Sequence, residues 1–213
     1  MKTITTALVL FMTISAAQAQ NLSFGPTAGF GHTWLAAKNT TYDNKFFPGF
    51  NAGVKLVYSV VPNWGLSADV KFSGEGGKIA GDVAGSPVET SYRAHYIRVP
   101  VQAIYFFGKL GDAVRPKVSL GPSVGFLVGG DTKYEVNGTQ TNSAKTSDVF
   151  DGFDAGINGA VGANFRLGGG KWLNTDVTYY HGFNNIIDGS GPAIRNRNLG
   201  INIGVTFPIG TAK

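Results

Sequence analysis

The chain has 213 residues, no cysteine and a formal net charge of +5 at pH 7. The lack of cysteine excludes a disulfide framework and the lipid-bearing cysteine of bacterial lipoproteins. Lysine and arginine are not clustered, so the charge does not indicate a nucleic-acid-binding protein. The 31 glycines follow no three-residue repeat, which excludes collagen, and 43% hydrophobic residues indicate a folded chain.

The beginning of the chain has the pattern of a secretory signal peptide. A positively charged start precedes an apolar run at residues 4–14, and residues 17–19 (AQA) have the form of a cleavage site. We therefore expect a signal peptide at residues 1–19 and one mature domain at residues 20–213. No later window is apolar over the roughly 18 residues that a membrane helix needs.

The remaining chain alternates between apolar and small or polar residues with the period of two that is typical of β-strands. For example, Val54 and Leu56 alternate with Gly53 and Lys55. These runs are longer than the usual five or six residues of a globular strand, and they reach the ~9–11 residues that a strand needs to cross a bilayer. The expected strands are residues 22–34, 49–61, 65–74, 92–107, 115–130, 150–167, 172–183 and 196–207.

The connections between these strands alternate between long and short. The four long loops are expected at residues 35–46, 75–91, 131–149 and 184–195. Outer-membrane barrels have long outer loops, short periplasmic turns and an even number of strands. The sequence therefore predicts an all-β protein, an eight-stranded antiparallel up-and-down transmembrane β-barrel after a cleaved signal peptide.

Prolines and aromatic residues refine this prediction. Pro26, Pro100 and Pro122 fall inside expected strands, where each removes a ladder donor, so we expect a β-bulge or a strand end at each. Aromatic residues gather near the strand ends, as in the two girdles of a membrane barrel. The expected periplasmic girdle is Tyr58, Trp64, Tyr105, Phe106, Phe107, Phe165, Trp172 and Phe207, and the outer girdle is Trp34, Phe46, Phe47, Tyr92 and Phe183.

Two stretches carry a resemblance to a known family. The first is residues 96–101 (YIRVPV), followed by residues 115–118 (RPKV) and 120–122 (LGP). The second is residues 176–186 (DVTYYHGFNNI). In these stretches the chain resembles the outer-membrane β-barrel domain family that includes the PorT-like proteins. The resemblance implies an eight-stranded barrel in the outer membrane of a Gram-negative cell. It implies little about activity, although the named members are linked to protein secretion.

Eight charged residues fall on the polar face of the expected strands, which we assign to the barrel lumen because a charge facing lipid is costly. They are Lys55, Asp69, Lys71, Arg98, Lys117, Asp154, Arg166 and Asp176. An eight-stranded barrel is about wide enough for its own side chains, so we expect a structural network of ion pairs that fills the lumen. A path for protons or ions is the alternative. Which of these charged residues pair with one another depends on the shear of the barrel, so the sequence does not assign the pairs.

The sequence offers little evidence for catalysis. His32, His95 and His181 lie near the outer strand ends, but they lack the close spacing of a metal site. We expect a non-enzymatic barrel with no metal and no cofactor. The expected partners are outer-membrane lipid, the barrel-assembly machinery and proteins that meet the outer loops, and we expect a monomer. The alternatives are a secreted, lipocalin-like barrel around a small hydrophobic ligand and a barrel enzyme that modifies lipid.

Overall fold

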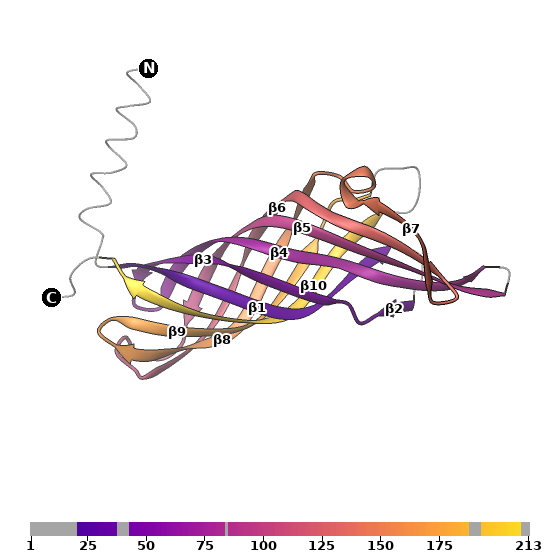
Figure 1. Ribbon diagram of the computed structural model, residues 1–213. Helices are drawn as coiled ribbons and strands as arrows, with labels where there is room; N and C mark the ends of the chain where they lie inside the picture. The colour runs from indigo at the N-terminus through magenta and orange to yellow at the C-terminus, as the bar shows by residue number, and fades with distance from the viewer. Residues whose placement is uncertain (1–20, 38–42, 84, 188–192, 210–213) are drawn as a thin grey trace, which may run out of the picture.

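The computed structural model describes residues 21–37, 43–83, 85–187 and 193–209. Eight strands form a closed antiparallel ring in the order β1, β3, β4, β5, β6, β8, β9 and β10, with β10 paired to β1 (Figure 1). Their bounds are Leu22–Ala37 (β1), Pro48–Val61 (β3), Trp64–Val83 (β4), Ser86–Phe106 (β5), Val114–Val136 (β6), Phe153–Gly168 (β8), Lys171–Gly182 (β9) and Ile194–Pro208 (β10). The predicted barrel of eight strands is confirmed. The signal peptide expected at residues 1–19 lies outside the described residues.

Short turns lie at one end of the barrel. They comprise residues 62–63, 107–113 and 169–170, and β1 begins and β10 ends at the same end (Figure 1). Barrels with an even number of strands keep short turns and both chain ends in the periplasm. We therefore call this the periplasmic end, and the opposite end the outer end.

Side chains alternate between the two faces of the ring as the period of two requires. Val54 and Ile203 face outward and are 53% and 54% exposed, whereas the neighbouring Lys55 and Asn202 face the lumen and are 8% and 6% exposed. An apolar exterior around a polar lumen is the reverse of a lipocalin, so the soluble alternative is wrong. Among the described residues, no helix is long and apolar enough to cross a membrane.

The strands pass through their prolines without a change of register. Pro26, Pro100 and Pro122 each keep the pairing with one neighbouring strand, while the pairing with the other neighbour is interrupted for two residues. The expectation of a bulge or a strand end at each proline is therefore wrong, because the missing N–H affects only one of the two ladders. In the ring, the register shifts lie elsewhere, at Ser59/Val61, His95/Tyr96 and Arg166/Gly168.

Two of the four expected outer loops, residues 75–91 and 131–149, are in fact largely strands. β4 continues to Val83 and β5 starts at Ser86, so these two strands form one long hairpin. β6 continues to Val136 and pairs with β7 (Thr139–Lys145), while β2 (Asp43–Lys45) pairs with β4. The outer halves of β4, β5 and β6, together with β2 and β7, make an open sheet that projects beyond the ring (Figure 1). We call it the outer sheet.

An apolar cluster lies at the outer end of the lumen. It consists of Leu35, Ala94, Tyr96, Phe150 and Ile186, each at most 3% exposed. The last two come from the connections before β8 and before β10, which pair with each other through an isolated bridge between Phe150 and Ile187. These connections therefore fold inward at the opening, and β8 begins three residues later than expected, at Phe153. We call this cluster the apolar cap.

Most of the expected girdle aromatics face outward. Trp64 is 52% exposed and its ring meets the edge of Tyr105 at a centroid distance of 5.1 Å. Four residues differ from the expectation. Phe106 and Phe47 are buried at 4% and 6% exposure, Tyr92 packs against the apolar cap, and Trp172 lines the inside of the periplasmic end. These rings contribute to packing inside the barrel ends, so only part of each predicted girdle can contact lipid.

Candidate functional site

The structure places seven of the eight expected lumen charges in buried positions. The seven are Lys55, Asp69, Lys71, Arg98, Lys117, Asp154 and Asp176. Arg166 is the exception, because its side chain is exposed at the periplasmic end of β8, beside the register shift between Arg166 and Gly168. Its pairing with Trp172 keeps the register of β8 and β9, so Arg166 stays on the lumen side of the strand at the rim. Arg166 therefore lies outside the buried group of charges.

Arg98 is the centre of the largest polar group. Its Nε donates to Glu75 Oε1 at 2.6 Å, and its Nη2 donates to Glu75 Oε2 at 2.7 Å and to Asp154 Oδ2 at 2.8 Å. The guanidinium lies over the ring of Tyr180, with 4.0 Å between Cζ and the ring centroid. Asn196 Nδ2 donates to Asp154 Oδ2 at 3.0 Å. One buried cation therefore serves two buried carboxylates, and Ser73 and Asn196 donate further hydrogen bonds to them.

Glu75 was missed by the sequence analysis, which assigned it to a glycine-rich loop. In the structure it lies on β4 and is 1% exposed. The signal was present, because Asp69, Lys71, Ser73 and Glu75 fall on alternate positions of one strand. Extending that alternation past Gly74 would have placed the Glu75 carboxylate in the lumen.

Two smaller ion-pair groups lie closer to the periplasmic end. Lys117 Nζ is 3.0 Å from Asp176 Oδ1 and 3.5 Å from the Asn174 side-chain oxygen. Asp69 Oδ2 lies between two ammonium groups, at 3.5 Å from Lys55 Nζ and 3.6 Å from Lys71 Nζ. Each of these four buried cations, Arg98 included, therefore has a carboxylate within ion-pair distance.

The lumen beside these groups has little free space. A cavity lined by Lys71, Glu75, Arg98 and Tyr180 measures about 20 Å³. A single water needs roughly 10–15 Å³ measured in this way. The centre of the lumen therefore has room for about one water next to the ion pairs.

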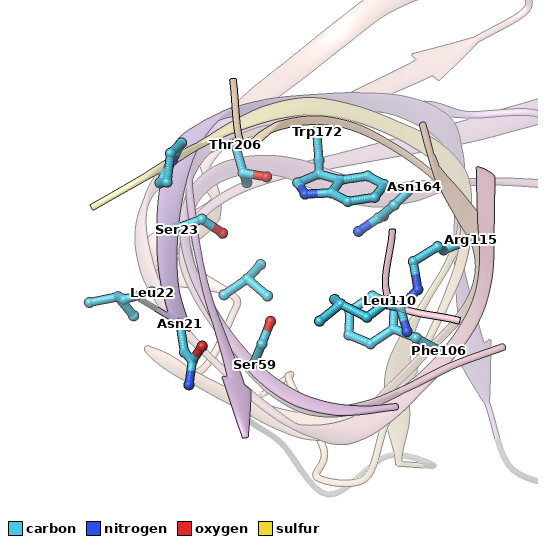
Figure 2. Close-up of a pocket in the computed structure, with 13 residues that line it drawn as sticks. Asn21, Leu22, Ser23, Ser59, Phe106, Leu110, Arg115, Asn164, Trp172 and Thr206 are labelled. Atoms are coloured by element: carbon cyan, nitrogen blue, oxygen red, sulfur yellow. The ribbon is translucent and has the colours of Figure 1, made fainter. Parts of the chain in front are cut away.

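A larger cavity of about 250 Å³ opens at the periplasmic end (Figure 2). Arg115 and Asn164, which are opposite each other on β6 and β8, lie on one side of it. Figure 2 shows Trp172 beside Asn164 and the Leu110 side chain reaching into the opening. Other walls include the hydroxyl groups of Ser23, Ser59 and Thr206. We call this cavity the periplasmic mouth.

The three histidines lie among aromatic rings near the outer end. His32 stacks between Trp34 and Phe46 with centroid distances of 5.1 Å, and His95 packs against Phe72. His181 accepts a hydrogen bond from Arg197 at 3.0 Å. In the described part of the chain, no three histidine, aspartate or glutamate side chains are grouped so that they could hold a metal ion.

A closed ring with an apolar exterior and a charged lumen defines an integral outer-membrane β-barrel. The chain belongs to the outer membrane protein beta-barrel domain family, whose model matches residues 17–188. The protein is accordingly a component of the cell outer membrane. A comparison with curated proteins found no match.

Several solved structures are similar to this chain. OprG from Pseudomonas aeruginosa is 12% identical, with a TM-score of 0.47, over 87% of this chain and 93% of that chain. The N-terminal barrel domain of OprF from the same organism is 14% identical, with a TM-score of 0.46, over 88% and 98%. Ail of Yersinia pestis, solved with the heparin analogue sucrose octasulfate, is 14% identical, with a TM-score of 0.43, over 88% and 99%.

Proposed function

We propose that this protein is a non-enzymatic, closed barrel that presents the outer sheet at the cell surface for interaction with a partner protein. The observation that carries the proposal is the continuation of β4, β5 and β6 beyond the ring as paired strands. Recognition often lies on segments that a rigid scaffold positions. A sheet hydrogen-bonded to the ring is held more firmly than a mobile loop would be.

The surface of the outer sheet is suited to contact with water and with proteins. Lys78 and Lys45 both pair with Glu89 on its outward face, the latter at 3.3 Å, and Lys133 is 3.8 Å from Asp131. β7 has mostly exposed side chains and pairs only with β6 among the described strands. An exposed strand edge is a place where an extended segment of a partner can add.

The filled lumen supports a role other than transport. The ion pairs around Arg98 and Asp69 occupy the centre of the barrel, and the apolar cap lies at its outer end. A conducting pore needs continuous water along its length, for which the cavity of about 20 Å³ beside Arg98 has no room. We therefore include in the proposal that the lumen network is a structural plug that closes the barrel. The alternative is that it forms a path for ions.

The remaining partners are also proposals. The outward-facing apolar residues favour outer-membrane lipid as the surrounding medium, and a barrel of this kind needs the barrel-assembly machinery for insertion. We propose a monomer, because the ring is closed and leaves no barrel strand unpaired in the described part of the chain. The narrower PorT-like assignment, with its link to protein secretion, rests on the resemblance at residues 96–101 and 115–122.

Site-specific photocrosslinking in intact cells tests the surface interaction. A photoreactive residue at Asn142 of β7 is expected to form a discrete protein adduct, whereas one at the lipid-facing Val161 forms none. Planar-bilayer recordings of the purified protein are expected to show conductance near zero. A steady conductance, or the absence of any adduct from the outer sheet, contradicts the proposal.

A further inference from the structure

The periplasmic mouth contains a buried cation without a carboxylate partner. Arg115 is 6% exposed, and in the described part of the chain no carboxylate lies within ion-pair distance of its guanidinium. Its Nη2 donates to the Pro62 carbonyl, and its Cζ lies 4.7 Å from the centroid of the Phe106 ring. Asp112 in the neighbouring turn acts on Arg115 only as a nearby charge, and its carboxylate accepts a hydrogen bond from the Lys109 backbone N–H at 2.7 Å. Arg115 therefore differs from the four paired cations deeper in the lumen.

Two buried polar atoms of this cavity also lack hydrogen-bond partners. They are Nε of Arg115, a donor, and Oδ1 of Asn164, an acceptor. The two side chains are cross-strand neighbours on the lumen face, so their polar groups border the same space. A buried polar group without a partner is costly, so water or a ligand in the adjoining cavity is expected to satisfy it.

We propose that the periplasmic mouth binds the carboxylate end of a small apolar acid, with Arg115 as the anchor. A carboxylate suits a guanidinium because both are planar and can form paired hydrogen bonds. The side-chain N–H of Asn164 and the hydroxyl groups of Ser23 and Ser59 can donate further hydrogen bonds to the carboxylate at the rim, whereas the Asn164 Oδ1 acceptor needs a donor such as water. This site is independent of the interaction proposed for the outer sheet, which lies at the opposite end of the barrel.

The apolar side chains that line the cavity indicate that the part of the ligand beyond its carboxylate is apolar. Phe106, Leu110 and Trp172 line the same cavity of about 250 Å³, which has space for a compact ring or a short acyl chain. A bare inorganic anion would leave these walls in contact with water, so an apolar body adds affinity. Leu110 is 68% exposed on the turn between β5 and β6 and stands at the opening.

The cavity ends inside the barrel. Asn174 donates to the Thr206 hydroxyl at 3.1 Å, and the ion pair between Lys117 and Asp176 lies next to it. These contacts close the inner side of the cavity, so a ligand enters from and leaves to the periplasm. The acid therefore reaches the site either as a free small molecule or as the C-terminal residue of a periplasmic peptide, since both present a carboxylate on an apolar body.

Calorimetry on the purified, folded protein in a neutral detergent tests this proposal. The probes are 3-phenylpropionate, its alcohol analogue 3-phenylpropanol, inorganic phosphate, and a short peptide ending in phenylalanine with a free or an amidated C-terminus. The phenylpropionate or the free-acid peptide is expected to bind about tenfold or more tightly than its uncharged counterpart, because a hydrogen-bonded charge pair is lost with the carboxylate. Which of the two binds identifies the source of the acid.

Variants assign the binding to the periplasmic mouth. Arg115→Gln is expected to lose about tenfold or more in affinity, while Arg166→Gln, an exposed arginine at the same end, keeps it. If Arg115→Gln does not fold, Leu110→Glu places a negative charge at the opening and is expected to have the same effect, with Lys109→Glu as its control. Equal binding of acid and alcohol, equal binding of phosphate, no binding of any probe, or full affinity in Leu110→Glu overturns the proposal.

Discussion

Arg98 of β5 reaches past β6 to Asp154 of β8, and its Nη2 lies 2.8 Å from the Asp154 Oδ2 atom. Because Arg98 also contacts Glu75 of β4, one guanidinium joins three of the eight strands of the ring. Both carboxylates are almost completely buried, at 0% and 1% exposure. The stability of the lumen therefore depends on this cation more than on any peripheral charge.

Arg98→Met is expected to destabilise the barrel strongly. It leaves Glu75 and Asp154 buried without their cation, and loss of one partner from a buried pair costs about 3–5 kcal/mol. Urea unfolding in detergent, followed by heat-modifiable migration on a gel, measures the change in the free energy of unfolding. Arg166→Met is the matched control because its side chain is exposed. Equal stability of the two variants would contradict the central role of Arg98.

The alternation along the strands was sufficient to predict which residues face the lumen, but it could not predict the pairs. Asp69 contacts Lys71 on its own strand and Lys55 on the neighbouring one. Arg98 and Asp154, by contrast, are separated by 56 residues and lie on strands that do not pair. Contacts of this second kind depend on the shear of the barrel, which sequence periodicity does not contain.

The sequence analysis did not predict the outer sheet because of the glycines in its strands. Residues 74–77 (GEGG) have the composition of a loop, because glycine is generally unfavourable in strands. In the structure Gly76 has φ of +131°, and an added Cβ would lie 1.8 Å from the Tyr92 carbonyl oxygen. Glycine at this position therefore allows β4 and β5 to approach closely. A composition-based boundary placed the end of the third strand at this point and omitted Glu75.

The apolar outer surface of the barrel predicts that a charged residue introduced there destabilises the protein, by an amount that depends on its depth in the bilayer. Val54→Arg and Ile203→Arg are expected to destabilise the protein by ~2–4 kcal/mol if they lie near the bilayer midplane. Thr139→Arg, on the exposed strand β7 of the outer sheet, is the control and is expected to be nearly neutral. Unfolding in lipid vesicles measures the three variants. Similar stabilities for all of them would show that the apolar exterior does not contact lipid.

The carboxyl group of Glu89, in the outer sheet beyond the membrane, is expected to have a pKa below its ordinary value. The hydrogen bond from Lys78 lowers the pKa of Glu89 below its ordinary value, with a further contribution from Lys45. A depressed pKa in the folded state means that the pair stabilises the sheet above the unfolded pKa of roughly 4.3. This contribution is lost as the pH falls through the folded pKa.

An NMR titration of the Glu89 side-chain carboxyl resonance measures this pKa directly. Lys78→Met is expected to raise the Glu89 pKa toward that of a free glutamate. Lys133→Met, which removes an exposed cation from the same sheet, serves as the control. If Lys78→Met leaves the Glu89 pKa unchanged, the hydrogen bond is not the cause of the shift.

Two adjacent glycine positions test how closely the barrel strands approach. Gly121 faces the lumen, and an added Cβ would lie 2.0 Å from the Val101 carbonyl oxygen and 2.7 Å from Gln102 Cα. These are backbone atoms of β5, so β5 and β6 would have to separate where the ladder between them is already interrupted. Gly121→Ala is therefore expected to destabilise the barrel by about 1–3 kcal/mol through overpacking.

Gly159 provides the matched control. It pairs with Leu120 of β6, and an added Cβ there meets only ordinary contacts of 3.4 Å and 3.7 Å. Gly159→Ala is the control in urea unfolding, and a loss in Gly121→Ala no larger than in this control would show that the close approach is not required.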